Sequence, residues 1–454
     1  MTQKYNTSTQ KIGPAKVNSP LPACRFIDDQ KLISINVDPE MLDEEDNGPI
    51  SMLFEGAGPR KKLYFDPSKT KCAIVTCGGL CPGINDVIRA IVMEAHHNYN
   101  VPSVLGIRFG LQGFIPDYGH PVMELRPENV SQIHEFGGTI LASSRGPQPP
   151  EDIVDAMERM NISILFMIGG DGTMKAAQVI QEEVTRRNNK MSIVGIPKTI
   201  DNDVNFISKT FGFDTAVEKA TEAIRCAHTE ALGAPNGIGM VKLMGRESGF
   251  IAAQATIALQ EVNFVLIPEF SFELHGDNGL LIQLEKRLKA RGHAVIVVAE
   301  GAGQELFERK GADPSGNIIL GDISSVLRAE IDEHFKQKNI SITLKFIDPS
   351  YIIRSVPANS NDRVYCGFLG QHAVHAAMAG KTGMLVSMLH DRFIYLPLSL
   401  TTHKRRTINT NSNYWGSVLA STGQSMTMRN ESTGLNKGSR NCSRVQTAEN
   451  TQKA

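Results

Sequence analysis

Residues 164–184 read ILFMI, GGDGT and MKAAQVIQEEV: a short apolar run, a turn rich in glycine, and an amphipathic stretch. The same succession occurs elsewhere, since CAIVT (72–76) precedes GGLCPG, SIVGI (192–196) precedes PKTIDND, and GMVKLM (239–244) precedes GRESG. Strands that alternate with helices indicate an α/β fold with a mostly parallel sheet. Such sheets bind ligands at the carboxyl ends of their strands, where these turns lie.

The overall composition indicates a globular protein. The chain has 454 residues, of which 41% are hydrophobic and 21% charged, and its net charge is −1. That length predicts roughly three folded units, and the balanced charge argues against nucleic-acid binding. No apolar run reaches the ~18 residues of a membrane span, and the polar start lacks a signal-peptide core. Seven cysteines then indicate free thiols, so we expect a cytoplasmic protein away from membranes.

The two ends of the chain differ from the middle. Residues 1–63 show little periodicity and include an acidic stretch, residues 38–46, so we expect an extension that is at most partly ordered. Residues 421–454 are rich in Ser, Thr, Asn and Gln. Such a composition buries too little apolar surface to offset chain entropy, which predicts a mobile tail.

The GGDGT turn is the first candidate for chemistry. Its glycines let backbone N–H groups approach a phosphate, and the helix that follows attracts anions at its N-terminus. Asp171 would repel phosphates unless a Mg²⁺ ion lay between them, because Mg²⁺ takes one or two carboxylates together with phosphate oxygens. The alternative is a tight strand-to-helix turn with an Asp cap. A Walker A pattern is absent from the sequence.

PKTIDND, residues 197–203, is the most specific motif. Asp201 and Asp203 are two residues apart in an extended segment, so their side chains face the same side. A carboxylate there can take a proton from an attacking hydroxyl. Lys198 can neutralise charge on a transferring phosphoryl group. A solvated turn is the alternative, which we disfavour because the run follows an apolar strand at the ligand edge.

Two arginines are further candidates for binding phosphate. Arg246 follows an apolar strand, where its planar guanidinium could bind phosphate through two hydrogen bonds. It could equally be a surface residue paired with Glu247. Arg145, followed by Gly146, suits a nucleotide phosphate or a salt bridge within a loop.

A second group of residues could bind a sugar phosphate. Tyr351 and Arg354, with Lys345 upstream, could contact one, although amphipathic core edges have a similar pattern. Glu300 ends a very apolar strand, where its carboxylate could accept hydrogen bonds from sugar hydroxyls or simply cap the strand.

Taken in order, CGGLCPGINDVIR, GGDGT, PKTIDND, VKLMGRESGFIA, VAEGAGQ and DPSYIIR resemble the phosphofructokinase family, in its long branch of plants, kinetoplastids and some bacteria. The resemblance covers residues 64–424. It implies two Rossmann-like α/β domains with mostly parallel sheets and an active-site cleft between them. The expected divisions are 64–210 for the nucleotide, 211–375 for the sugar phosphate, and 376–420 returning to the first domain.

The resemblance also implies a reaction and a role for each motif residue. The reaction transfers the γ-phosphoryl group of ATP to the 1-hydroxyl of fructose 6-phosphate, in a homo-oligomer of which a tetramer is one form. Asp201 would accept the proton, Lys198 and Arg246 would assist, and Asp171 would hold Mg²⁺. The implied nucleotide residues are Gly78, Arg145, Gly146, Gly170, Asp171, Gly172 and Thr173. The implied sugar-phosphate residues are Thr199, Ile200, Asp201, Asp203, Met244, Gly245, Arg246, Glu300, Lys345, Tyr351, Ile352, Ile353 and Arg354.

Gly172 predicts the phosphoryl donor. Relatives that use pyrophosphate resemble GGDDS, and a carboxylate there would repel the α-phosphate of ATP, whereas Gly leaves room. We therefore predict ATP. Lys198 is shared with the pyrophosphate users, so a pyrophosphate-dependent phosphotransferase is one alternative. A catalytically silent member that binds nucleotide and regulates a partner is the other.

Overall fold

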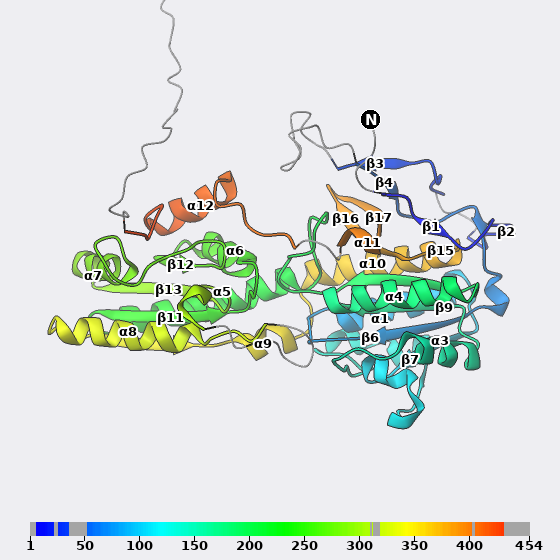
Figure 1. Cartoon of the computed structure of the whole chain (residues 1–454), viewed down its shortest axis with the longest axis horizontal. Coiled ribbons are helices and arrows are strands. Elements are labelled where there is room, and N and C mark those ends of the chain that lie inside the picture. The colour runs from blue at the N-terminus through cyan, green and yellow to red at the C-terminus, as the bar shows by residue number, and fades with distance from the viewer. Residues whose placement is uncertain are drawn as a thin grey trace, which may run out of the picture.

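Two sheets with helices packed against them lie side by side along the long axis of the molecule (Figure 1). The computed structural model describes residues 6–21, 26–35, 52–308, 311, 318–401 and 405–430. The acidic stretch, residues 38–46, and residues 431–454 of the predicted tail lie outside the described residues. The arrangement confirms the predicted α/β fold class.

The first sheet has nine strands in the order β3-β4-β17-β16-β10-β9-β6-β7-β8. Its central strands are parallel, and they are β6 (Lys71–Thr76), β7 (Ser103–Ile107), β9 (Ile164–Gly169), β10 (Ser192–Pro197) and β16 (Met384–Leu389). Antiparallel strands complete both edges, and they are β3 (Leu32–Ser34), β4 (Leu53–Gly56), β8 (Met123–Leu125) and β17 (Arg392–Pro397).

The first sheet is buried on both faces. Along β9, Phe166 and Ile168 belong to one apolar cluster, whereas Leu165 and Met167 belong to another. Successive side chains of a strand point to opposite faces of the sheet, so both faces are apolar and each must be covered by helices. One cover is formed by α1 (Ile84–Met93) and α10 (Ser360–Met378), and the other by α3 (Pro150–Arg159) and α4 (Asp171–Arg186).

The second sheet is entirely parallel, with the order β12-β13-β11-β14. Its strands are β11 (Gly237–Leu243), β12 (Phe264–Leu266), β13 (His293–Ala299) and β14 (Thr343–Ile347). Its helices are α5 (Phe213–Leu232), α6 (Phe250–Leu259), α7 (Leu280–Arg291) and α8 (Ile323–Gln337). The short α9 (Ser350–Ser355) contacts α5, and α12 (Asn413–Thr422) packs on α6.

The helices and strands group across the expected divisions at three places. The expected boundary at residue 375 would cut α10, which packs mainly on α1 and on β10 of the first sheet and also contacts α5. Of the segment 376–420, β16 and β17 join the first sheet, but α12 lies on the second. The expected extension, residues 1–63, contributes β3 and β4 to the first sheet. These pairings are between segments far apart in sequence, which local patterns do not report.

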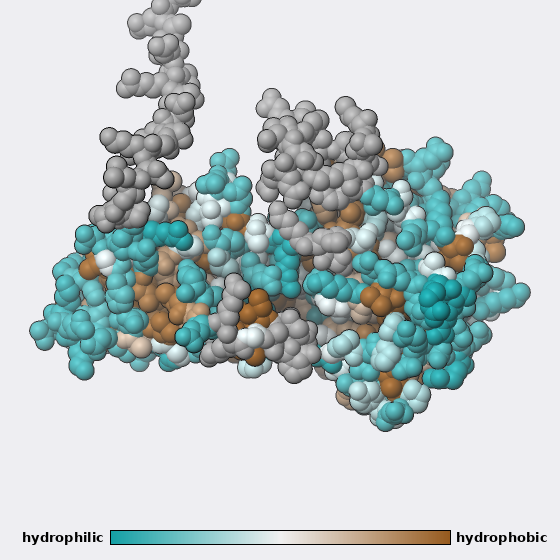
Figure 2. All heavy atoms as spheres, viewed as in Figure 1, coloured by the Kyte–Doolittle hydropathy of each residue, from teal (hydrophilic) through white to brown (hydrophobic). Residues whose placement is uncertain are grey.

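Most of the surface seen in Figure 2 is hydrophilic, with hydrophobic residues in smaller patches. Within the described residues, none of the helices combines the length and the apolar character that crossing a bilayer would require.

Candidate functional site

A cleft of about 1380 Å³ lies where the two sheets face each other, and residues that follow β9, β10, β11 and β13 form its walls. The predicted residues that line it are Gly78, Arg145, Gly146, Gly170, Asp171, Gly172, Thr173, Lys198, Met244, Arg246, Glu300, Tyr351 and Arg354. The predicted residues that are not among its lining are Thr199, Ile200, Asp201, Asp203, Gly245, Lys345, Ile352 and Ile353. The cleft therefore joins motifs from both halves of the chain.

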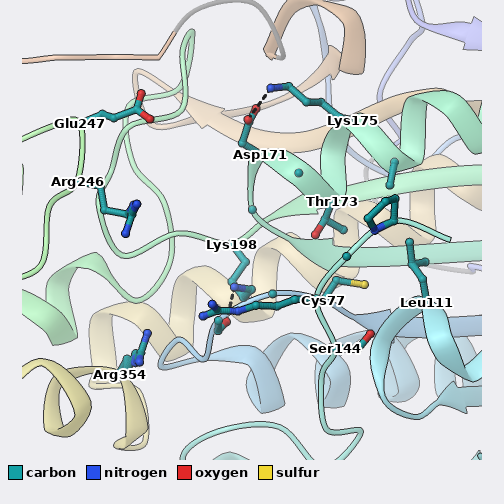
Figure 3. Close-up of a pocket in the computed structure, with 18 of the residues that line it drawn as sticks. Cys77, Leu111, Ser144, Asp171, Thr173, Lys175, Lys198, Arg246, Glu247 and Arg354 are labelled. Atoms are coloured by element: carbon teal, nitrogen blue, oxygen red, sulfur yellow. Dashed lines mark hydrogen bonds and ion pairs between the residues drawn. The ribbon is translucent and has the colours of Figure 1, made fainter. Parts of the chain in front are cut away.

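The glycine-rich turn after β9 forms one wall of the cleft. Asp171 is the first residue of α4, and its carboxylate lies 2.8 Å from the Nζ of Lys175, one helical turn later (Figure 3). A Cβ atom added to Gly172 would meet no heavy atom within 4 Å, so this position borders open space. A helix N-terminus with bare backbone beside it suits the phosphates of a nucleotide.

The Asp171 carboxylate fits a magnesium ion that arrives with phosphates. Its side chain is 30% exposed beside the cleft. Among the described residues, no three His, Cys, Asp or Glu side chains come together in a group able to hold a metal ion. Mg²⁺ is usually bound by one or two carboxylates together with substrate phosphates rather than by a full protein cage, so the single Asp171 carboxylate, which here pairs with Lys175, is sufficient.

Three cations converge on the turn after β6. The Nζ of Lys198 donates to the carbonyl oxygen of Gly79. A Cβ atom added to Gly79 would lie 3.7 Å from Nη1 of Arg354 and 4.0 Å from Nη2 of Arg145. Burial lowers the pKa of Lys198, and the two arginines act in the same direction. Such a concentration of positive charge favours a phosphoryl group at this point.

Asp201 is a carboxylate in an unusual environment. Its Oδ1 is buried and has no hydrogen-bond partner within the described chain. Burial raises the pKa of Asp201 to about 8, and the nearby carboxylates of Asp203 and Glu300 add to the rise. A perturbed carboxyl group next to a cleft is a typical candidate for acid–base chemistry. The backbone around it is fixed, because Ser248 Oγ donates to the Asp201 carbonyl at 3.2 Å.

The opposite wall comes from the second sheet. Arg246 donates through Nη2 to the carbonyl of Ile318 at 2.5 Å, so its guanidinium is held at the cleft by a neutral acceptor. Glu300 follows β13, and burial raises its pKa. The ring of Tyr351 lies 4.9 Å from the guanidinium carbon of Arg354. These groups could bind a phosphorylated polyol by charge and hydrogen bonds.

Several predicted residues lie away from the cleft lining. Ile353 is fully buried in the core, whereas Ile352 is 64% exposed. Lys345 is exposed on β14, the edge strand of the second sheet. Gly245 has a φ of +131°, and a Cβ there would lie 2.5 Å from the Ser248 carbonyl, so it shapes the turn before Arg246.

Arg405 is the main residue that the sequence reasoning missed. Its guanidinium lies 2.9 Å from an Asp203 oxygen, 3.2 Å from Glu247 and 3.8 Å from Asp171. It therefore joins carboxylates of three motifs that are distant in sequence. The basic run KRR, residues 404–406, was the only signal in the sequence, and such runs are usually solvated surface.

Three further cleft residues carry charge that the sequence reasoning did not single out. Lys175 pairs with Asp171, as described above. Lys242, on β11, lies 2.8 Å from a carboxylate oxygen of Asp348, and both residues line the cleft. Helical spacing from Asp171 could have indicated Lys175, because residues four apart share a helix face.

Known proteins share much of this sequence. The sequence profile described as "Phosphofructokinase" matches residues 71–377. A protein of Borreliella burgdorferi named "ATP-dependent 6-phosphofructokinase" is 49% identical, over 92% of this chain and 97% of its own length. One of Amycolatopsis methanolica with the same name is 46% identical, over 82% of each chain.

Among solved structures, the fold is similar to that of a pyrophosphate-dependent phosphofructokinase from Marinobacter aquaeolei. The TM-score is 0.65, with 18% identity over 81% of this chain and 95% of that chain. At this identity the likeness concerns the fold alone.

Proposed function

Since the chain belongs to the phosphofructokinase family, we propose that it is an ATP-dependent 6-phosphofructokinase. The enzyme transfers the γ-phosphoryl group of ATP to the 1-hydroxyl of fructose 6-phosphate and forms fructose 1,6-bisphosphate. The observation that carries the choice of donor is the open space beside Gly172, next to Asp171 at the start of α4. The names of the relatives at 46–49% identity support the same choice.

The donor is proposed to lie along the wall formed by the GGDGT turn. The N-terminus of α4 and the bare backbone at Gly170 and Gly172 would hold its phosphates, while Arg145 neutralises part of their charge. Asp171 would hold a Mg²⁺ ion, which supplies charge neutralisation for the phosphoryl oxygens when it is bound.

The acceptor is proposed to lie between the PKTIDND and MGR segments. Asp201 would take the proton from the sugar 1-hydroxyl as that oxygen attacks phosphorus. Its raised pKa matches a base that works near neutral to weakly alkaline pH. Arg246 and Arg354 would bind the 6-phosphate, and Glu300 would accept hydrogen bonds from sugar hydroxyls.

Lys198 would stabilise the charge that develops during transfer. Its amino group is buried and fixed on the Gly79 carbonyl, so it needs little reorganisation when the phosphoryl group passes. Phosphoryl transfer depends mainly on such positioning and electrostatic stabilisation.

A coupled assay with fructose 6-phosphate and either ATP or pyrophosphate tests the proposal. We expect kcat/KM with ATP to exceed that with pyrophosphate by at least about 100-fold, roughly 3 kcal/mol. A higher value with pyrophosphate would make the chain a pyrophosphate-dependent phosphotransferase. Tight binding of ATP without any transfer would make it a silent regulatory member.

We also propose that the enzyme is a homo-oligomer in the cytoplasm, with a tetramer as the expected size. The side chains of Tyr351, which lines the cleft, and of its neighbour Ile352 are 76% and 64% exposed and support contact with a second subunit. Light scattering of the purified protein would give the assembly, and a monomer at micromolar concentration would contradict this part.

A further inference from the structure

A second cavity of about 440 Å³ lies beside the cleft, a volume within the usual range for small-molecule sites. Its lining includes Asn202 from the PKTIDND segment, Arg406 and Asn409 from the segment after β17, and Phe250 and Tyr414 from two helices. None of the roles proposed above uses this cavity.

Arg406 gives the cavity its charge. Its Nη1 donates to the carbonyl oxygens of Ser208 at 3.0 Å and Ile207 at 3.4 Å, and its guanidinium carbon lies 4.7 Å from the centre of the Phe250 ring. Burial lowers the pKa of Arg406, and no carboxylate of the described residues forms an ion pair with it. A partly buried cation is costly without a counter-charge, so an anion in the cavity would stabilise it.

The other charged residues of the lining do not neutralise the positive charge of Arg406. Lys209 and Asp214 also line the cavity, but they form an ion pair with each other. Within the described residues, Arg406 is therefore the one charged lining group whose charge is not balanced by another.

Three helices add positive potential to the same cavity. Phe213 and Phe250, the first residues of α5 and α6, both line it, and so does Ser412, the N-cap of α12. Figure 1 shows α12 lying over α6 at this side of the second sheet. Carboxylates already complement two of these ends, since Glu269 accepts from the N–H of Gly249 before α6 and Asp362 accepts from the N–H of Thr215 in α5. The dipole of each helix still favours an anion such as phosphate near its N-terminus.

We propose that this cavity is a binding site for a small phosphorylated molecule, distinct from the nucleotide and sugar positions of the cleft. The phosphate contacts Arg406 and the helix N-termini. The rest of the molecule occupies the space beside the rings of Phe250 and Tyr414, whose centres are 6.4 Å apart.

The site adjoins the catalytic segment. The backbone N–H of Arg406 donates to the carbonyl of Asp203 at 2.8 Å, and the preceding Arg405 pairs with the Asp203 carboxylate at 2.9 Å. Arg405 lines the cleft and Arg406 the second cavity. An occupant of the cavity therefore contacts the segment that holds Asp203 in place.

Trp415 offers a local reporter of binding. It is the only tryptophan of the chain, it is 2% exposed, and its backbone N–H donates to Ser412 Oγ at 3.4 Å. We expect titration with glycerol 3-phosphate to give a saturable change in its emission, with a dissociation constant below about 1 mM. Glycerol, the neutral counterpart, should give none.

Asn409→Asp is the decisive variant. Asn409 Oδ1 accepts from the N–H of Asn411 at 2.9 Å, and the aspartate keeps that acceptor while adding a negative charge to the lining. We expect at least about tenfold weaker binding, because the new carboxylate repels the phosphate. Asn411→Asp adds the same charge on an exposed residue that does not line the cavity, and it should change affinity less than about threefold.

Two more variants separate this site from the cleft. Arg406→Met should also lose binding, with Arg406→Lys restoring part of it and melting curves confirming the fold. Arg246→Met, in the cleft, should leave the Trp415 titration unchanged. The proposal is overturned by no saturable change up to about 10 mM, by equal affinity in Asn409→Asp and Asn411→Asp, or by loss of the signal in Arg246→Met. None of these readouts depends on enzymatic activity.

Discussion

At the scale of single residues, the donor depends on Gly172, a position without a side chain. Its surroundings are open to at least 4 Å from where a Cβ would stand, so a larger residue fits without a clash. Charge and not bulk is then the physical variable at this position. This makes the choice of donor testable by substitution without a large change in the fold.

Gly172→Asp should lower kcat/KM for ATP by about 100-fold, because a carboxylate near the α-phosphate costs roughly 3 kcal/mol of repulsion. Asp in the first turn of α4 is favourable for the helix, so the melting temperature should not fall. Gly172→Ala is the control: it fills the same space without charge and should stay within about threefold of wild type. Equal losses in both variants would contradict the electrostatic explanation.

Asp201→Asn should lower kcat by about 10²–10⁴, the usual loss when a general base is removed. In wild type, kcat/KM should rise with pH and level off above about 8, because Asp201 must be ionised to act and its pKa is raised to about 8. Initial rates across pH 6–10 measure this rise of kcat/KM with pH, the rising limb of the pH profile. A variant with normal turnover, or a wild-type rate that is flat across this range, would contradict the assignment.

The same raised pKa predicts an effect on stability with a definite sign. The folded protein retains the Asp201 proton up to pH about 8, whereas the unfolded chain releases it near pH 4, so wild-type stability falls as pH rises between these values. The asparagine side chain of the Asp201→Asn variant does not titrate. This variant should therefore melt higher than wild type at pH 8.5, with little difference near pH 4, as measured by differential scanning calorimetry.

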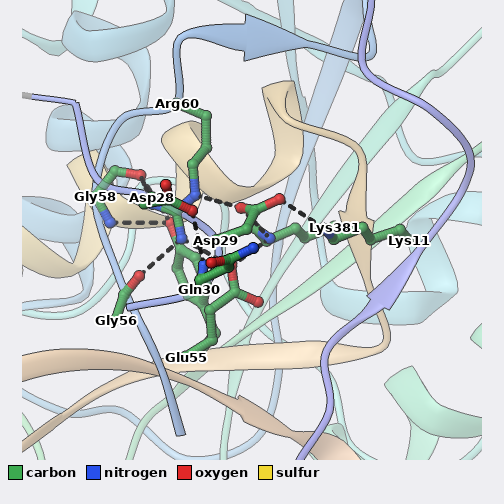
Figure 4. Close-up of polar contacts among 10 residues, drawn as sticks. Lys11, Asp28, Asp29, Gln30, Glu55, Gly56, Gly58, Arg60 and Lys381 are labelled. Atoms are coloured by element: carbon green, nitrogen blue, oxygen red, sulfur yellow. Dashed lines mark hydrogen bonds and ion pairs between the residues drawn. The ribbon is translucent and has the colours of Figure 1, made fainter. Parts of the chain in front are cut away.

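At the scale of elements, a cluster of ion pairs attaches the N-terminal strands to the first sheet (Figure 4). Arg60 donates to Asp29 at 2.7 Å and to Glu55 at 2.8 Å, and Lys381 bonds to both carboxylates. Lys381 is 1% exposed, whereas Lys11, which also pairs with Asp29, is 47% exposed. Partial burial raises the pKa of Asp29. The three cations outweigh this effect, so the pKa of Asp29 is lowered overall.

Lys381→Met should reduce the free energy of unfolding by about 3 kcal/mol, because it removes a buried cation that pairs with both carboxylates and leaves Arg60 as the remaining partner of the buried Glu55. Lys11→Met removes an exposed partner of the same Asp29 and should cost less than about 1 kcal/mol. Urea denaturation of both variants measures the difference. Equal small effects would show that the cluster does not attach the strands.

The cluster also predicts acid sensitivity. The folded-state pKa of Asp29 is depressed, so its ion pairs stabilise the folded protein at pH values above the ordinary carboxyl pKa near 4. This stabilisation is lost as the pH falls below that value.

At the scale of the whole molecule, Arg405 links the two halves and the C-terminal segment. It pairs with Asp171 of the first half, with Glu247 of the second, and with Asp203 between them. Its positive charge also lowers the pKa of Asp201. Arg405 is thus a positioning residue whose effect should be visible in the pH profile.

Arg405→Met should lower kcat/KM by about 100-fold and move the rising limb of the pH profile, which reports Asp201 ionisation, to higher pH, because the Asp201 carboxylate loses a stabilising charge. Arg405→Lys should restore the position of the limb. A loss of activity with an unshifted limb would mean that Arg405 acts only on the fold.

The sequence by itself determined the α/β class and pointed to part of the cleft lining. Each apolar run that ends in a glycine-rich turn specified a strand end, and parallel strands bring those ends to one edge, so Asp171, Lys198 and Arg246 could be grouped in advance. Their chemistry was equally readable, since carboxylate, amine and guanidinium near a glycine turn suit phosphates.

Only the tertiary structure decided which distant segments complete the site. Arg405 reaches Asp171 across 234 positions of sequence, and α10, β3 and β4 join the first sheet from opposite ends of the chain. Residue patterns report local periodicity, whereas these contacts depend on how buried faces far apart in sequence pack together. The raised pKa of Asp201 likewise arises from burial beside Asp203 and Glu300, and burial is a property of the folded chain.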